Sequence, residues 1–214
     1  NQNFNLLVSQ APSVVYPVNK NHTLRLSFSA AIRNPTLSDQ YLNYNVGRAI
    51  LVGNLHGYDS LATIESFVDY ISGTKLNPDT LRYFNVDPIK PEKVKTIEIG
   101  YRATVFKSLY IDASYYYSFY RDFIGYKLGV KIKTDQLGFP TYEQAYRVSA
   151  NAPDLVTTQG VSVALNYFFL KFLSINGNYT FNLIDLHGSS NPIIPAYNTP
   201  THKFNVGVAG REIE

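Results

Sequence analysis

The chain has 214 residues, with 18 tyrosines and 13 phenylalanines but no cysteine, methionine or tryptophan. Charged residues make up only 16%, against roughly 25% in soluble domains, and the net charge of +3 comes without a basic run, which excludes a nucleic-acid-binding class. No stretch approaches the roughly 18 apolar residues of a membrane-spanning helix. Low charge with many tyrosines favours a β-barrel in lipid, because such a barrel needs charge only at its rims and in its lumen.

The first predicted elements are two strands joined by a tight turn. Residues 11–17 (APSVVYP) form a short apolar strand, and VNKNH forms the turn. From His22 to Ile32 the polarity alternates, with Leu24, Leu26, Phe28, Ala30 and Ile32 on one face and Thr23, Arg25, Ser27 and Ser29 on the other. Alternation with period two over about ten residues is typical of a membrane-spanning strand of a barrel.

A long connection follows and runs to Lys93, and within it we expect a short amphipathic helix over about residues 60–72. Its apolar residues at helical spacing are Leu61, Ile64, Phe67, Val68 and Ile71. Asp59 or Ser60 is available as the N-cap and Gly73 as the terminator. We expect the apolar side to pack on the rest of the connection, while Asp59, Glu65 and Asp69 are solvated.

Two similar hairpins come next, Thr96–Phe119 and Gly160–Leu183, and each has a short turn that contains one lysine, Lys107 or Lys171. The tyrosine-rich far ends predict an aromatic girdle at the outer membrane interface, made of Tyr115, Tyr117, Tyr179 and Phe181. A charge facing lipid costs about 2–4 kcal/mol at mid-depth, so the polar alternating residues are expected to face the lumen. These residues are Arg25, Arg33, Glu98, Arg102, Asp112, Asn166, Asn176, Asn178 and Asn182.

The connections alternate between short and long. Long excursions cover about residues 121–154 and 184–200, and a last strand is expected over 201–209. Outer-membrane barrels have short periplasmic turns and long extracellular loops. The sequence therefore predicts an all-β fold, an antiparallel transmembrane β-barrel segment of about seven strands with long extracellular loops, one of which carries a short helix. A soluble β-sandwich stays open as an alternative.

No catalytic or metal-binding constellation emerges, so we expect neither an enzyme nor a bound cofactor. The four histidines are scattered, and His22 and His202 lie at strand starts, where an interfacial position is expected. A cation site at Asp185, His187 and Asn191 is not favoured, because such a cluster arises easily in a polar loop. Solute contacts are predicted instead in the outward loops, at Arg33, Asn34, Tyr41, Tyr44, Arg48, Asn191 and Tyr197.

Four phrases resemble segments of TonB-dependent outer-membrane receptors, in the order of that family. IRNPTLSDQY resembles the R-x-P-T segment after a barrel strand, with Arg33, Pro35 and Thr36 matching. The pair Gly53-Asn54 followed by IKPEKVKTIEIGYR matches at Pro91, Glu92, Glu98, Gly100 and Tyr101. YYYSFYRDFIGY resembles the next strand with its loop, and NTPTHKFNVGV resembles a later Pro-x-His strand. The style of the loops is similar to that of Bacteroidota-type receptors.

The resemblance implies a location in the bacterial outer membrane and a barrel of about 22 strands around a plug. Neither a plug, a TonB box nor a closing C-terminal strand is recognised, so residues 1–214 are expected to be a partial outer-membrane β-barrel domain. The implied partners are outer-membrane lipid, TonB with its inner-membrane energising complex, and a surface lipoprotein or other outer-membrane protein, but no nucleic acid.

Two functions follow from the resemblance. The first is energised import of a scarce solute, of the siderophore, cobalamin, glycan or peptide class. The second is a structural barrel subunit of an outer-membrane assembly or secretion complex, whose loops bind partner proteins.

Overall fold

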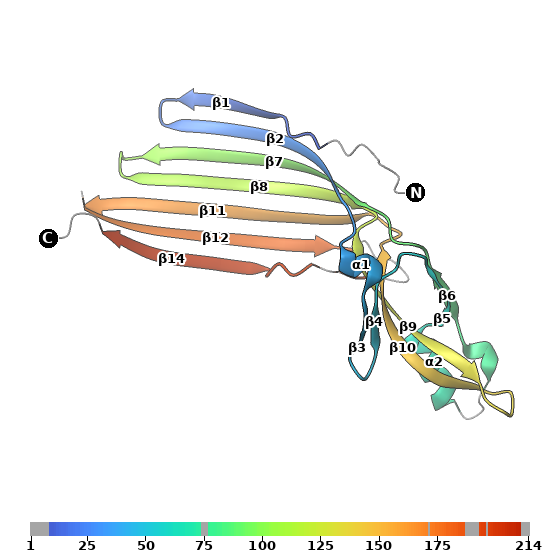
Figure 1. Ribbon diagram of the computed structural model, residues 1–214. Helices are drawn as coiled ribbons and strands as arrows, with labels where there is room; N and C mark the ends of the chain where they lie inside the picture. The colour runs from blue at the N-terminus through green and yellow to red at the C-terminus, as the bar shows by residue number, and fades with distance from the viewer. Residues whose placement is uncertain (1–8, 74–76, 171, 187–192, 196, 211–214) are drawn as a thin grey trace.

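The computed structural model describes residues 9–73, 77–170, 172–186, 193–195 and 197–210, which form two sheets and a few short helices. One sheet is long and open, and the second lies beyond one of its ends (Figure 1). We call them the wall sheet and the loop sheet. Within the described part of the chain, no helix is long and apolar enough to cross a membrane.

The wall sheet has seven strands, each antiparallel to its neighbours, in the order β1-β2-β7-β8-β11-β12-β14. The strands are β1 (Ser13–Asn19), β2 (His22–Arg33), β7 (Glu92–Val105), β8 (Leu109–Arg121), β11 (Val156–Leu170), β12 (Leu173–Asp185) and β14 (His202–Gly210). The two similar hairpins are β7–β8 and β11–β12. The predicted antiparallel wall segment is thereby confirmed.

Short turns and long connections leave the wall sheet at opposite ends, as the sequence predicts (Figure 1). The turn between β7 and β8 holds Phe106 and Lys107 in left-handed backbone conformations, with φ of 52° and 60°. The second turn lysine, Lys171, lies outside the described residues. The three long connections, residues 34–91, 122–155 and 186–201, are called the first, second and third connection below.

The register of the wall sheet separates apolar from polar side chains, because direct cross-strand partners point to the same face. One continuous row consists of Leu26, Ile99, Tyr115, Val161 and Phe181. This apolar face is open: Leu26 is 51% exposed, Ile99 55% and Val206 76%. A large exposed apolar face marks a surface that is covered by lipid or protein.

The loop sheet is built from all three connections. The first supplies β3 (Asn43–Asn45), β4 (Ile50–Val52), β5 (Tyr58–Ala62) and β6 (Tyr83–Val86), the second supplies β9 (Ile124–Thr134) and β10 (Pro140–Asn151), and the third supplies β13 (Ile194–Pro195). The order is β3-β4-β10-β9-β5-β6, with β13 also on β9. The connections thus carry far more structure than the single short helix that the sequence predicts.

The predicted helix is present but begins later than expected. Helix α2 covers Ile64–Ser72, and its N-cap is Thr63, whose side chain accepts a hydrogen bond from the backbone N–H of Ser66 at 3.2 Å. The N-cap prediction of Asp59 or Ser60 is wrong, because both belong to strand β5. Gly73 follows the helix as its C-cap, as predicted.

The packed side of α2 also differs from the prediction. The buried residues are Ser66 and Tyr70, whereas Ile64, Val68 and Ile71 are 41%, 47% and 54% exposed. Ser66 tolerates burial because its hydroxyl is fully engaged: it donates to the Thr63 carbonyl at 3.0 Å and accepts from the backbone N–H of Arg82 at 3.0 Å. Two further short helices are α1 (Leu37–Tyr41) and the 3₁₀ helix η1 (Pro78–Thr80).

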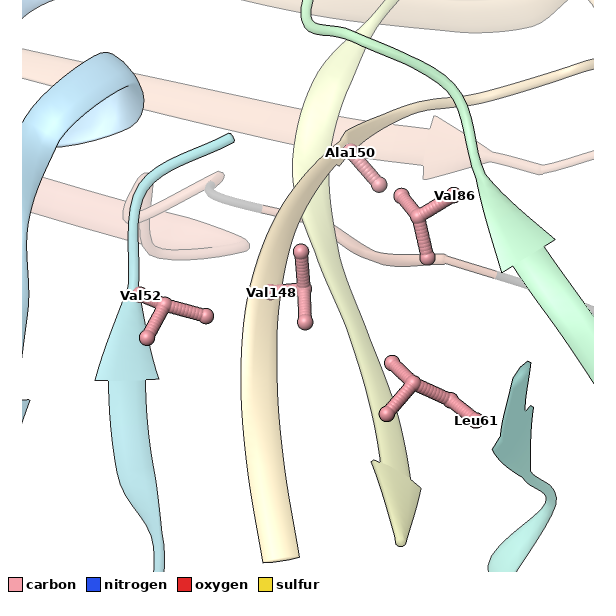
Figure 2. Packing of buried hydrophobic residues seen from close by; sticks show 5 residues of the cluster. All are labelled: Val52, Leu61, Val86, Val148 and Ala150. Carbon is pink, nitrogen blue, oxygen red and sulfur yellow. The ribbon is translucent and has the colours of Figure 1, made fainter. Parts of the chain in front are cut away.

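Two hydrophobic clusters hold the loop sheet together. In the first, Val52, Leu61 and Val86 of the first connection pack against Val148 and Ala150 of β10 (Figure 2). The second consists of Phe123, Ala152, Val156 and Ile193, so it joins the second and third connections to the wall strand β11. Both clusters therefore join connections that are distant in the sequence.

Candidate functional site

An ion pair joins the ends of two wall strands at the point where the loop sheet begins. Arg33, at the end of β2, donates through Nε and Nη2 to the two carboxylate oxygens of Glu92, the first residue of β7, at 3.2 Å each. Glu92 is buried, and its Oε2 also accepts the backbone N–H of Ile124 at 2.9 Å. This carboxylate thus joins the wall sheet to the start of β9.

Helix α1 and the Gly53-Asn54 pair form one folded unit in the first connection. Thr36 caps α1 through reciprocal hydrogen bonds with Asp39, its Oγ1 accepting the Asp39 backbone N–H at 3.1 Å and its own N–H donating to Asp39 Oδ2 at 2.9 Å. A Cβ on Gly53 would lie 2.4 Å from the backbone of Gln40 and Tyr41, so only glycine fits beside this helix.

Asn54 is completely buried, and its side chain links three segments. Its Nδ2 donates to the carbonyls of Asp87 at 2.7 Å and Ser149 at 2.9 Å, and its Oδ1 accepts the N–H of Gly57 at 2.9 Å. The residues of the R-x-P-T and Gly-Asn phrases therefore have structural roles: they fix the shape of the first connection.

A hollow lies between α1 and the segment that joins β4 to β5. Its lining consists of Tyr41, His56 and Tyr58 together with Gln40, Leu42, Asn43, Gly53, Leu55 and Gly57. Among the described residues, no Asp, Glu, Lys or Arg lines it. Burial, and secondarily the nearby Tyr146, raises the pKa of the Tyr58 phenol, so this hydroxyl stays a neutral hydrogen-bonding group. The hollow can therefore offer aromatic rings and neutral hydrogen-bonding groups to a solute.

The residues that the sequence predicts as solute contacts lie at separate places in the structure and do not form one site. Tyr41 lines the hollow and is 63% exposed; Tyr44, in β3, is 61% exposed. Asn34 and Arg48 are exposed at the surface of the first connection, while Arg33 is engaged by Glu92. Tyr197 packs against the second hydrophobic cluster, and Asn191 lies outside the described residues. Solute contact by these residues stays a prediction.

The polar residues predicted to face the lumen share one face of the wall sheet, which we call the polar face. Arg25 Nη2 contacts Glu98 Oε1 at 2.6 Å, and Arg102 donates from Nε and Nη2 to Asp112 Oδ2 at 3.0 and 2.7 Å. Gly100 lies between the two pairs, and a Cβ there would be 3.0 Å from Arg25 Nη2. This part of the polar face, on β2, β7 and β8, carries ion pairs.

Amides replace ion pairs on the other part of the polar face. Asn176 and Asn178 are exposed on β12, and Asn205 Nδ2 donates to Asn178 Oδ1 at 2.9 Å. Asn182 Oδ1 accepts from the Tyr116 hydroxyl at 2.8 Å. The polar face thus divides into an ion-pair part and an amide part. That it faces a lumen stays a prediction.

Two histidine–tyrosine pairs lie on the apolar face. His22 Nδ1 is hydrogen-bonded to the Tyr101 hydroxyl at 2.6 Å, near the short turns, and His202 Nδ1 to the Tyr179 hydroxyl at 2.9 Å, at the start of β14. In both pairs the rings are stacked. Amphipathic rings of this kind suit a boundary between apolar and aqueous surroundings.

The sequence did not identify His56, Tyr58 or the hollow around them. The available signal was the Gly53-Asn54 pair. Glycine permits a close backbone approach, and an asparagine amide can hold neighbouring loop segments by hydrogen bonds when it is buried, so this pair indicates a loop of fixed shape. Among the described residues, no group of three or more His, Asp or Glu side chains is arranged to hold a metal ion. Of the unfavoured cation cluster, His187 and Asn191 lie outside the described residues.

The chain matches a known family over most of its length. Residues 5–211 match the family described as "TonB dependent receptor-like, beta-barrel". No curated protein sequence matches the chain.

Several solved structures share the fold at low sequence identity. They include the copper transporter OprC, with a TM-score of 0.58 at 14% identity, covering 96% of this chain and 24% of that one. The Serratia marcescens hemophore receptor HasR, solved with its hemophore HasA and heme, has a TM-score of 0.57 at 14% identity and coverages of 96% and 29%. The siderophore receptor PirA from Pseudomonas aeruginosa has a TM-score of 0.52 at 14% identity and coverages of 83% and 28%. The chain thus spans only 24–29% of the length of these three proteins.

Proposed function

This chain belongs to the TonB-dependent receptor-like β-barrel family, and from that membership we propose that it forms the wall and the outward loops of a transporter that imports a scarce solute. It is a segment of an outer-membrane barrel. In the proposed function the apolar face contacts lipid, the polar face lines the lumen, and the loop sheet lies on the extracellular side. Energy comes from TonB and the inner-membrane energising complex.

The observation that carries the proposal is the hollow beside α1. Helix α1 lies at the end of the wall sheet opposite to the short turns (Figure 1). The backbone of the segment that lines the hollow is held by the hydrogen bonds of the buried Asn54 and by the close approach of Gly53 to α1, which supports a hollow whose backbone is already in place before a solute binds. Because its lining offers aromatic rings and neutral polar groups, we favour a solute recognised by stacking and hydrogen bonding over one recognised by ion pairs. Siderophore, cobalamin, glycan and peptide solutes remain the candidate classes.

A scaffold function has its own supporting observation. The exposed side of α2 presents Ile64, Val68 and Ile71, which lie at helical spacing and suit contact with another protein. A surface lipoprotein or another outer-membrane protein would be the partner. In that case the barrel would serve an assembly or secretion complex without importing a solute.

One experiment separates the two functions. Cells carrying the full-length protein, cells lacking it, and cells lacking TonB are grown in one complex medium, and the solutes left in the medium are compared by mass spectrometry. Import predicts a solute that is consumed only when both proteins are present, and Tyr41→Ala and Tyr58→Ala variants should slow its consumption. Identical media from all three strains would contradict import, and loss of a copurifying protein in an Ile64→Asp/Val68→Asp variant would then support the scaffold.

A further inference from the structure

Strand β9 contacts segments from all three connections. Along one edge it pairs with β10 of its own connection, from Ile124 to Thr134. Its other edge is shared: Tyr126 and Gly125 pair with Ile194 and Pro195 of the third connection, and Val130 pairs with Ala62 of the first. One strand edge therefore sets the position of two connections that are distant in the sequence.

Two glycines of β9 make this sharing possible. A Cβ on Gly125 would lie 2.4 Å from the carbonyl oxygen of Ile194 and 2.5 Å from the Ile193 side chain. A Cβ on Gly129 would lie 2.9 Å from Leu61 Cβ and from Phe84 Cζ. Neither glycine has a positive φ, so glycine is not needed for its backbone conformation. It is needed at both positions because there is no space for a side chain.

Each glycine lies beside one of the two hydrophobic clusters. Ile193, next to Gly125, is 3% exposed in the second cluster, and Leu61, next to Gly129, is 2% exposed in the first. Since close-packed interiors transmit displacements, a shift at either glycine moves buried side chains of another connection.

The β9–β10 hairpin also pairs with both strands that flank the segment lining the hollow. Residues 53–57 of this segment lie between β4 and β5. Strand β4 pairs in parallel with β10, with Val52 opposite Val148, and β5 pairs with β9 through Ala62. The spacing of the two sides of the segment is therefore set by one hairpin of the second connection.

We propose that Gly125 and Gly129 are positioning residues of the hollow, and that β9 couples the third connection to the first. A displacement of Ile193 and Ile194 is then transmitted along β9 to Leu61 and the lining segment. The coupling concerns the loop sheet itself, so it goes beyond the proposed function and holds for a transporter and for a scaffold alike.

The test is hydrogen–deuterium exchange by mass spectrometry on the full-length protein in detergent micelles. Gly129→Ala should raise exchange about tenfold in residues 53–62 and 83–86. Gly125→Ala should raise it at the amides of 193 and 194 and also in 53–62, although the atoms nearest to a Cβ at position 125 belong to Ile193 and Ile194. Gly177→Ala is the matched control, because its Cβ would meet only ordinary contacts, 3.5 Å to the Asn205 carbonyl and 4.0 Å to Val206; it should change neither segment.

A second variant keeps the test decisive if an alanine at position 125 prevents folding. Ile193→Ala removes the side chain beside Gly125 without adding a clash, and the proposal expects faster exchange in both 193–195 and 53–62. Faster exchange confined to 193–195 in Gly125→Ala or Ile193→Ala would overturn the coupling. An equal increase in Gly177→Ala would overturn it as well, since the response would then not depend on β9.

Discussion

The carboxylate of Glu92 accepts a hydrogen bond from the backbone N–H of Ile124 at 2.9 Å. Glu92 begins the wall strand β7 and Ile124 begins β9, so this one contact joins the two sheets at their bases. The same carboxylate is paired with Arg33 at the end of β2. A family phrase that contains Pro-Glu therefore has a structural explanation: the glutamate fixes where the loop sheet starts.

We expect Glu92→Ala to destabilise the loop sheet by about 1–3 kcal/mol, because it leaves a buried N–H and the guanidinium of Arg33 without their acceptor. The measurement is the midpoint of unfolding in denaturant, with circular dichroism as the signal that reports unfolding. Glu65→Ala is the control, since Glu65 is 87% exposed and lies 3.8 Å from Arg82; a surface pair of this kind contributes little. Equal midpoints for the two variants would show that the Glu92 junction does not stabilise the sheet.

The wall sheet was predictable from the sequence because each strand shows its two faces as an alternation. In β2 and β7, apolar residues such as Leu26 and Ile99 alternate with Arg25 and Glu98, and the structure confirms this separation. Strand β9 carries a similar signal at Ile124, Tyr126, Leu128, Val130 and Ile132, so it too was accessible to the same reasoning.

What the sequence could not supply is how the connections pair. The parallel pairing of Val52 with Val148 joins residues far apart in the chain, and no local pattern encodes it. The two faces of α2 show a second limit. Helical spacing indicates burial of Ile64 and Val68, yet Ser66 is buried instead, because hydrogen bonds to Thr63 and Arg82 satisfy its hydroxyl. The hollow lies beside strand β4, whose pairing with β10 was not predictable, so only Gly53 and the neighbouring Asn54 were visible beforehand.

Glycines on the polar face of the wall should differ sharply in their tolerance of a side chain. A Cβ on Gly160 would lie 2.5 Å from the Phe181 carbonyl and from Tyr116, whereas a Cβ on Gly100 would meet only the flexible end of Arg25 at 3.0 Å. We expect Gly160→Ala to cost about 1–3 kcal/mol and Gly100→Ala much less. Gel mobility of unheated samples measures the folded fraction, and a similar loss in both variants would contradict the packing around Gly160.

The Tyr58 phenol should make the loop sheet sensitive to alkaline pH. Its pKa is raised above the ordinary value of 10.0, chiefly by burial, so the folded state holds the proton more tightly than the unfolded state. This stabilisation is fully present below pH 10.0 and is lost as the pH rises through the raised pKa. Above pH 10.0, the Tyr58→Phe variant should therefore lose less stability with rising pH than the unsubstituted protein does. The measurement is the unfolding midpoint of both proteins at a series of pH values on either side of pH 10.0. Tyr44→Phe removes the hydroxyl of an exposed ring, so its stability should depend on pH as that of the unsubstituted protein does. If the stability of Tyr58→Phe also had this pH dependence, the partial burial of the Tyr58 hydroxyl would not affect stability.

The two faces of the wall sheet predict opposite responses to a new lysine. Ile99 is 55% exposed on the apolar face, so Ile99→Lys places a charge against lipid, at a cost of about 2–4 kcal/mol at the bilayer midplane. Asn178 lies on the polar face beside Asn205, where a lysine can stay hydrated, and Asn178→Lys should be tolerated. The measurement is the amount of folded full-length protein in isolated outer membranes. If Asn178→Lys were lost and Ile99→Lys were retained, the polar face would be the one in lipid, and the lumen assignments of Arg25, Glu98, Arg102, Asp112, Asn176 and Asn178 would have to be reversed.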